Sequence, residues 1–512
     1  MESSKIGVHI KKYGLDYLIL IAAVLVYFLV TYPVLNRLII DYDSTYQVAL
    51  TNHTLSEIWE LLPYDYSPPF YAFFIKLFSV FGTTIEILRL SSLIPYVGAV
   101  ILALLPLRRA FGEVAARLSA ICFIFTPIMF NLLYRTRPHV MGFFFVTGAF
   151  IFACLYYKYN LKKDLILLTV FSVLSMYTHN VAMVTVFGFY VAFVVVYLIE
   201  KDYKNFKNII VSGVVCAVCY IPWLIIVIHQ MNNVMDNYWA NFMTIDGFIS
   251  ALFLNHFSDF NNNLLWKIGG CIVSIYWIVS LVIMIKNKGN DEIKSTLKEN
   301  SKILRFLILI FIIPIYIYIF INLSVMPIYS SRYVYQLSGM SLILFCLLIA
   351  KTDKKKVLSI FVALIMVANY IFAVHNFDKN HRYTNIEGLV NEIKNRSGDD
   401  IAFVHSHEWS LGVMMYYFPN ARHYFTDESF TVLTTFDVFP SEVINVGDPE
   451  NIFDYEEEFY VFDCPQFNYV EWEPKHYYMD FDDCTYDEFN ETYYDVFNED
   501  SETTVGVVRK IS

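Results

Sequence analysis

Long apolar stretches recur along the first three quarters of this chain, and short polar segments separate them. A stretch of about 17–25 apolar residues can cross the roughly 30 Å of hydrocarbon in a bilayer as a helix. The pattern predicts eleven such helices, at residues 15–38, 84–107, 114–132, 139–157, 164–178, 181–199, 208–230, 264–286, 303–322, 333–350 and 356–374. We therefore expect a polytopic α-helical membrane protein.

Basic residues are unevenly distributed among the predicted loops. Lys5, Lys11 and Lys12 precede the first apolar stretch, which is too long for a signal peptide and lacks a small-residue cleavage site. Basic clusters then recur in every second loop, at 108–117, 158–163, 201–207, 286–302 and 351–356. Because cytoplasmic loops are enriched in Lys and Arg, we expect a multi-pass protein of the cell membrane with a cytoplasmic N-terminus and an extracytoplasmic C-terminal region.

The last quarter of the chain has a different pattern. An amphipathic helix is predicted at 386–393, a short apolar strand at 401–405, and another helix after it. This pattern is typical of a small soluble α/β domain. The sequence thus predicts a transmembrane domain at 1–374, whose first outer loop spans 39–83, and an extracytoplasmic domain at 375–512.

Composition supports this division. Hydrophobic residues make up 57% of the chain and the mean hydropathy is +0.47, which is high for a soluble protein. The net charge of −11 comes from the C-terminal region, because residues 448–502 contain 19 acids and one Lys. Aromatic residues alternate with these acids, which favours a folded domain over a disordered acidic tail. Two cysteines of this region, Cys464 and Cys484, could pair in an oxidising exterior.

Polar residues gather at the predicted outer ends of the spans. Ionisable residues at a membrane boundary are costly unless they are solvated or paired. Each one has an ordinary explanation, as a helix cap, a snorkelling arginine or a turn proline. Their location on one side of the membrane favours a shared polar site. They are Asp41 and Asp43, Ser67, Pro68 and Pro69, Arg89, Arg135 and Arg137, His179 and Arg332.

The segments that carry these residues resemble the motifs of membrane glycosyltransferases with the GT-C fold. In chain order they read DYDSTYQVA, YSPPFY, LRLSSLI, RTRPHVMGF, YTHN, YIPWL and SRYVYQLSG, and they cover most of residues 15–350. The resemblance is to family 39, the dolichyl-phosphate-mannose-protein mannosyltransferase-like group, which includes the aminoarabinose transferases. It implies about eleven transmembrane helices, with interfacial helices in the first outer loop.

Two positions depart from that family's pattern. Ser44 stands where the family usually has Glu, and Ser67 stands where it usually has His. If either family residue helps to hold a divalent metal ion, this chain must manage without it or use Asp41. The sequence leaves the need for a metal open.

The resemblance implies transfer of one sugar from a polyprenyl-phosphate donor at the outer face, with inversion at the anomeric carbon. Asp43 matches the family's loop acid and is the first candidate for the general base, and Asp41 is the second. Arginines bind phosphate and keep their charge in a partly dry site. The donor phosphate is therefore assigned to Arg332, Arg137 and Arg135, with Tyr333 and His179 beside it. Ser67, Pro68, Pro69, Tyr71 and Arg89 are assigned to positioning the loop.

Two other classes of function stay open. A transporter or flippase of lipid-linked sugars would place polar groups near the bilayer midplane and commonly has repeated halves, neither of which the sequence indicates. An inactive relative serving as a subunit is the other alternative, suggested only by Ser44 and Ser67. The expected partners are the lipid donor, membrane lipids and an acceptor that could be protein, lipid or glycan. Nucleic acid is not expected, and neither the sugar nor the acceptor can be named from the sequence.

Overall fold

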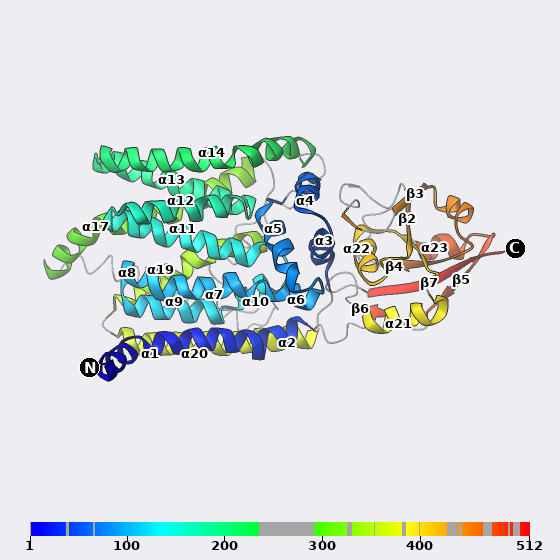
Figure 1. Cartoon of the computed structure of the whole chain (residues 1–512), viewed down its shortest axis with the longest axis horizontal. Coiled ribbons are helices and arrows are strands. Elements are labelled where there is room, and N and C mark those ends of the chain that lie inside the picture. Colours follow the sequence, from blue (N-terminus) through cyan, green and yellow to red (C-terminus); the bar gives the residue numbers. More distant parts are fainter. Residues whose placement is uncertain are drawn as a thin grey trace.

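The structure is a computed structural model of the whole chain. It describes residues 2–36, 40–64, 67–234, 291–324, 330–352, 354–380, 386–398, 400–426, 438–439, 443–463, 474–489, 492–494 and 502–511. A helical bundle carries the N-terminus at one end and meets a sheet-containing C-terminal domain at the other (Figure 1). The bundle confirms the predicted polytopic helical fold.

Among the described residues, seven helices are long and apolar enough to cross a membrane. They span Tyr13–Leu35, Ile85–Phe111, His139–Tyr159, Asn180–Glu200, Tyr203–Ile228, Lys302–Ser324 and Lys355–Asn376. An eighth crossing is formed if the bent pair Glu113–Phe125 and Pro127–Leu133 counts as one span. The bend of 55° follows from Pro127, since the residue before a proline is pushed into the extended conformation that Thr126 adopts.

Three of the eleven predicted spans remain. Residues 164–178 correspond to α12 (Lys162–Met176), whose 15 residues would extend only about 22 Å. Residues 333–350 correspond to a shorter apolar helix, Tyr335–Ala350. The predicted span at 264–286 lies outside the described residues. Helix length and composition thus support seven or eight of the eleven predicted spans. Residues 164–178 and 333–350 are also helical but form shorter helices.

The helices of the bundle have the following bounds. The first span comprises α1 (Glu2–Val26), the π-helical turn Tyr27–Thr31 and α2 (Tyr32–Leu35), and the loop after it contains α3 (Tyr42–Leu50), α4 (Leu55–Leu61) and α5 (Phe70–Phe78). Next come α6 (Ile85–Leu90), α7 (Leu93–Leu102), α8 (Arg108–Phe111), α9 (Glu113–Phe125), α10 (Pro127–Tyr134), α11 (His139–Tyr159), α12, α13 (Asn180–Glu200) and α14 (Tyr203–Val234). The last are α17 (Asp291–Ser324), α18 (Ser331–Val334), α19 (Ser338–Ala350) and α20 (Lys355–Asn380).

Burial separates the central helices from those that face outward. Almost all of α11 is buried, and it packs against α7, α12, α13 and α19. The helices α14, α17 and α20 instead expose isoleucine, leucine and valine side chains, such as Ile225, Ile312 and Leu364. A helix that is apolar on its outer face is stable in contact with lipid tails. The exposed face of the bundle is therefore suited to the bilayer interior.

Ion pairs join the helices at the end of the bundle that carries the N-terminus. The carboxylate of Asp16, on α1, contacts the guanidinium groups of Arg108 and Arg117. Asp164, at the start of α12, is fully buried and pairs with Arg109. Buried charges need such partners, because an unpaired one costs several kcal/mol, on the order of 3–5. These arginines belong to a cluster that the charge pattern assigns to the cytoplasm, and the sidedness itself stays a prediction.

Gly188 allows α13 to cross α17 closely. A Cβ atom added at Gly188 would lie 2.6 Å from the Cα atom of Pro314. Since a backbone atom cannot move aside as a side-chain rotamer can, we expect Gly188→Ala to force the helices apart and to lower the free energy of unfolding by about 1–3 kcal/mol. Thermal unfolding of the purified chain in detergent measures this loss.

Gly213→Ala is the matched control for this prediction. A Cβ at Gly213, on α14, would meet only the Tyr190 ring, at 3.4 Å. Because alanine favours a helix over glycine by up to about 1 kcal/mol, this variant should unfold at the same or a slightly higher temperature. Equal losses in the two variants would contradict the close crossing at Pro314.

The C-terminal domain is built on one mixed sheet. Its strands are β1 (Ala402–His405), β2 (Arg422–Thr426), β3 (Val443–Gly447), β4 (Glu458–Asp463), β5 (Cys484–Glu488), β6 (Tyr493–Tyr494) and β7 (Glu502–Lys510). The order is β3-β2-β1-β4-β7-β5, with β6 beside β7. Strands β1 to β4 pair in parallel, whereas β7 pairs antiparallel with β4, β5 and β6. This confirms the predicted C-terminal domain, in which α21 (Ile386–Ser397) precedes β1 and α22 (Glu408–Tyr417) follows it.

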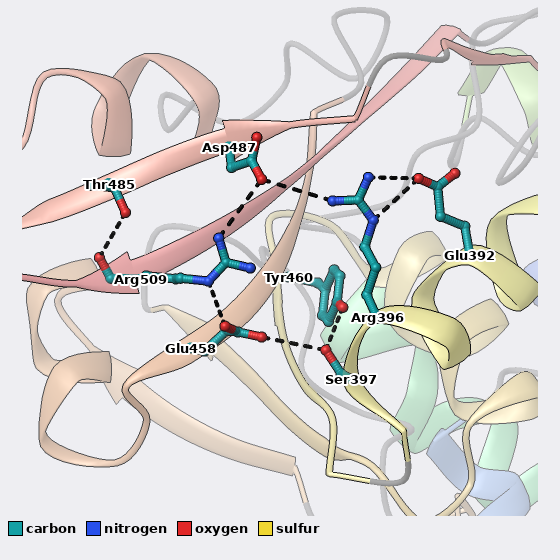
Figure 2. A network of polar contacts seen from close by, with 8 residues as sticks. All are labelled: Glu392, Arg396, Ser397, Glu458, Tyr460, Thr485, Asp487 and Arg509. Carbon is teal, nitrogen blue, oxygen red and sulfur yellow. Dashed lines mark hydrogen bonds and ion pairs between the residues drawn. The ribbon is translucent and has the colours of Figure 1, made fainter.

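Polar contacts attach α21 to the edge of this sheet (Figure 2). Arg396 binds Glu392 on its own helix and lies 3.8 Å from Asp487 on β5. Ser397 hydrogen-bonds the Tyr460 hydroxyl of β4 at 2.5 Å. The network is largely exposed, so each of its ion pairs contributes less than about 1 kcal/mol. The apolar face of α21 on the sheet core supplies more of the stability.

Cys484 lies on β5 as a buried, free thiol, whereas Cys464 lies outside the described residues. The pairing that the sequence allowed is therefore not present at Cys484. The division of the chain at residue 374 stays a proposal, because α20 continues to Asn380.

Three buried histidines connect β1, β2 and α22. Nε2 of His405 lies 3.0 Å from Nδ1 of His423, and Nδ1 of His405 lies 3.0 Å from Oγ of Ser410. Nδ1 of His407 accepts the backbone N–H of Ser410. Burial lowers the pKa of His405 well below its usual value, the pKa of His407 to about 3 and the pKa of His423 to about 4.

These histidines should make the C-terminal domain sensitive to acid. The folded domain keeps them neutral, whereas the unfolded chain binds protons below a pKa of about 6.5. Their contribution to the free energy of unfolding is thus complete above pH 6.5. It is lost as the pH falls, by about 1 kcal/mol for each histidine between pH 6.5 and 5.5. Hydrogen exchange of β1 and β2 in the full chain measures the effect, with α9, which has no histidine, as internal control. Unchanged protection of β1 and β2 from pH 7 to 5 would contradict it.

Candidate functional site

The two aspartates of the first outer loop lie at the start of α3. Asp41 is the N-cap, and its Oδ1 accepts the backbone N–H of Ser44 at 2.7 Å. Asp43 lies in the first turn. Acidic side chains stabilise a helix N-terminus by satisfying its unpaired N–H groups and opposing its dipole. The sequence D-Y-D-S therefore starts a helix and leaves the Asp43 carboxylate on its surface.

Two arginines from a distant segment meet these aspartates. Arg135 and Arg137 lie in the bend between α10 and α11, where the Arg137 N–H donates to the Arg135 carbonyl oxygen and Pro138 is the N-cap of α11. Arg137 forms an ion pair with Asp43, and Arg135 lies 3.5 Å from both Asp43 and Asp41. The side chains of Asp43 and Arg137 are 28% and 11% exposed. These charges are thus screened by water less than a surface pair is.

Ser44 joins the same two segments. Its Oγ accepts the backbone N–H of Thr136 at 3.1 Å, and its side chain is buried. The bond attaches the residue between the two arginines to α3. The serine that departs from the family pattern thus has a defined role here, which is to hold the arginine segment against the helix that carries Asp43.

Three aromatic rings lie together just after the arginine segment. His139, the first residue of α11, has its ring centre 5.6 Å from that of His179 and 6.0 Å from that of Tyr333. The rings of His179 and Tyr333 are 4.8 Å apart. Nδ1 of His179 accepts the backbone N–H of Val181 at 3.1 Å, which places the proton of the neutral ring on Nε2.

Of the predicted site residues, the structure therefore brings together Asp41, Asp43, Arg135 and Arg137, and separately His179 and Tyr333. Arg332 lies on α18 next to Tyr333, and its side chain is outside what the structure describes. His139 was missed by the sequence reasoning. Its position two residues after Arg137 in RTRPHVMGF was the signal that could have identified it.

At Pro68 and Pro69 the first outer loop turns and contacts the C-terminal end of α12. The backbone N–H of Phe70 donates to the carbonyl oxygen of Tyr177 at 3.0 Å. Pro68 and Pro69 are buried and Ser67 is half-buried. The turn is followed by α5, which buries Tyr71 and exposes apolar side chains toward its end, namely Leu77 and, just after it, Val80 and Phe81. These features are those expected for the predicted interfacial helix.

Arg89 contacts the end of the first span. It is almost fully buried on α6, and its guanidinium donates to the carbonyl oxygen of Leu35 at the end of the first span. The Tyr27 hydroxyl donates to the Arg89 carbonyl oxygen at 2.9 Å. Arg89 thus fixes the point from which the first loop leaves the bundle.

The residues around α3 do not fit a divalent cation. Such ions need several oxygen ligands, whereas Asp41 and Asp43 both face arginines. Within the described part of the chain, no group of three or more His, Cys, Asp and Glu side chains could hold a metal ion.

Comparison with known proteins adds the family context. Residues 66–226 match the family model described as dolichyl-phosphate-mannose-protein mannosyltransferase. The crystal structure of ArnT from Cupriavidus metallidurans in the apo state is similar over 95% of this chain and 97% of that one, with a TM-score of 0.63 and 11% identity. This chain has the GT-C fold. No curated protein matches the sequence.

Two further structures share the GT-C fold with this chain. ArnT from Cupriavidus metallidurans bound to undecaprenyl phosphate has a TM-score of 0.61 at 11% identity, covering 96% of this chain and 98% of that one. The oligosaccharyltransferase from Archaeoglobus fulgidus, tethered with an acceptor peptide, has a TM-score of 0.50 at 13% identity, covering 86% of this chain and 65% of that one. The matched segment 66–226 contains both arginines and both histidines, whereas Asp41, Asp43 and Tyr333 lie outside it.

Proposed function

We propose that this chain is a membrane glycosyltransferase that moves one sugar from a polyprenyl-phosphate donor to an acceptor hydroxyl. The observation that carries the proposal is the contact of Asp43 with Arg135 and Arg137. The helix α3, which carries Asp43, lies at the end of the bundle that meets the C-terminal domain (Figure 1). The family match supports glycosyl transfer. The undecaprenyl phosphate bound by the ArnT of Cupriavidus metallidurans supports a lipid phosphate as the donor's leaving group.

Each residue has a defined task in this reaction. The acceptor hydroxyl attacks the anomeric carbon, the bond from that carbon to the phosphate oxygen breaks, and polyprenyl phosphate leaves. Asp43 takes the proton of the hydroxyl as general base. Arg137 and Arg135 stabilise the negative charge of the leaving phosphate. A guanidinium has five N–H donors in a planar fork, so each arginine can bind Asp43 and the phosphate together.

A single displacement of this kind inverts the anomeric carbon. The remaining groups are assigned to the donor: His139, His179 and Tyr333 to the sugar and phosphate, with Arg332 beside them on α18. Ser67, Pro68, Pro69 and Tyr71 position the first loop. The site and the C-terminal domain face the extracytoplasmic side, in agreement with the distribution of basic residues.

Sugar transfer by the purified chain in detergent tests this function. A panel of radiolabelled polyprenyl-phosphate monosaccharides is offered to wild type and to Asp43→Asn, with water as fallback acceptor. We expect wild type to release sugar from one donor, with inverted anomeric configuration, and the variant to fail. If wild type binds these lipids but never cleaves them with any acceptor, the transporter and the inactive-subunit alternatives take precedence.

A further inference from the structure

The helix α22 of the C-terminal domain contributes side chains to two apolar clusters. Leu411 and Met415 belong to the apolar cluster that contains Tyr46 and Leu50 of α3. Val413 and Met414 belong instead to the core formed with the sheet of the C-terminal domain. Residues four apart share a helix face, so α22 is held between its own sheet and the helix that carries Asp43.

Gly412 lies close to α3. A Cβ atom at this position would lie 2.3 Å and 2.7 Å from Cδ2 and Cε2 of the Tyr42 ring, and 3.1 Å from Oγ1 of Thr45. A side chain larger than hydrogen fits there only if the Tyr42 ring, α3 or α22 shifts. A second contact follows in the same loop, where Nε2 of His53 lies 2.7 Å from the carbonyl oxygen of Val438.

The two faces of α3 have different partners. Tyr42, Thr45 and Tyr46 share one face by helical spacing, and this face meets α22. Asp43 and Ser44 point to the arginine segment, through Arg137 and the Thr136 N–H. Tyr42 and Asp43 are adjacent residues of α3, so a shift of α3 at Tyr42 would move Asp43 relative to the arginines.

We propose that Gly412 is a positioning residue, through which the C-terminal domain holds α3 in the place where Asp43 meets Arg137. The domain is thus part of the catalytic arrangement although it supplies no reacting group. This inference rests on the proposed function for its kinetic consequence. The mechanical link between α22 and α3 can be tested without it.

The experiment compares three alanine variants of the full chain in detergent. Gly412→Ala adds a methyl group against Tyr42, and we expect kcat to fall by about 10–100-fold, because a shift near 1 Å at a reacting group has that effect. KM for the lipid donor should stay within about twofold, since the arginines remain. Tyr42→Ala, added to Gly412→Ala, removes the obstructing ring and should restore most of the lost kcat.

Gly506→Ala is the matched control. Its Cβ would lie 2.3 Å from the ring of Tyr486, a similar clash inside the same domain but between β7 and β5. It should destabilise the domain and leave kcat of the folded protein unchanged. If Gly412→Ala and Gly506→Ala lower activity only in proportion to their loss of folded protein, and Tyr42→Ala restores nothing, the positioning role is wrong.

A readout without activity separates this inference from the proposed function. Hydrogen exchange across Tyr42–Leu50 should accelerate in Gly412→Ala, return toward wild type in the double variant and stay unchanged in Gly506→Ala. This pattern in a chain that transfers no sugar would refute the function and keep the link. Unchanged exchange in Gly412→Ala, together with unchanged kcat, would refute the link itself.

Discussion

Replacing Asp43 by Asn is expected to lower kcat about 10³-fold, within the 10²–10⁴-fold range of a general base. Asparagine has nearly the same shape, so Arg137 keeps an oxygen to bind. What is lost is the negative charge and the ability to take a proton from the acceptor hydroxyl. KM for the donor should change much less than kcat, and single-turnover transfer from labelled donor measures the chemical step directly.

Asp41→Asn separates the two aspartates. Asp41 already uses Oδ1 to cap α3 at Ser44, and Asn caps a helix about as well as Asp does. We expect less than about a tenfold change in kcat for this variant. The opposite ranking of the two variants would make Asp41 the base.

The membrane helices could be predicted because their signal is local. An apolar run of sufficient length has few alternatives to a spanning helix, and each predicted stretch that the structure describes is helical. The broken crossing at Pro127 and the short α12 show the limit of this reasoning. Hydropathy measures the run but not the bend, which depends on the backbone around a single proline.

The residues of the candidate site were selected from the sequence, but the sequence did not predict their arrangement. Asp43 and Arg137 were each selected, for separate tasks, from their place at the ends of spans. The ion pair between them joins residues 94 apart in the chain, and no periodicity reports such a contact. The start of α3 was accessible, because Asp is a preferred N-cap residue, but these residues were interpreted as loop.

For the C-terminal domain, the sequence predicted only the fold class, a small α/β domain. Helix 386–393 and strand 401–405 were predicted close to their positions in α21 and β1. The strand order and the contact of α22 with α3 depend on packing between distant segments. Gly412 lies close to Tyr42 of α3, and a glycine within a helical pattern has no sequence signal that would distinguish a close approach from an ordinary position.

Replacing Arg137 by Ala is expected to lower kcat/KM about 10²–10³-fold, the effect of removing one charged group that stabilises a transition state. The reason is geometric, since Arg137 is the less exposed arginine and makes the closer contact with Asp43. Arg137→Lys should recover only part of the loss, because an ammonium group keeps the charge but cannot bind carboxylate and phosphate as a fork. Steady-state transfer at varied donor concentration measures the three enzymes.

The two other arginines decide where the phosphate binds. Arg135 lies 3.5 Å from both aspartates and is more exposed, so Arg135→Ala should lose less than Arg137→Ala. Arg396→Ala, in the exposed network of the C-terminal domain, controls for the loss of a positive charge and should leave transfer unchanged. If Arg332→Ala abolishes transfer while Arg137→Ala retains it, the leaving phosphate binds beside Tyr333. Arg137 would then serve only to hold Asp43. The charge of the leaving phosphate would be stabilised by Arg332 on α18, near the rings of His139 and His179.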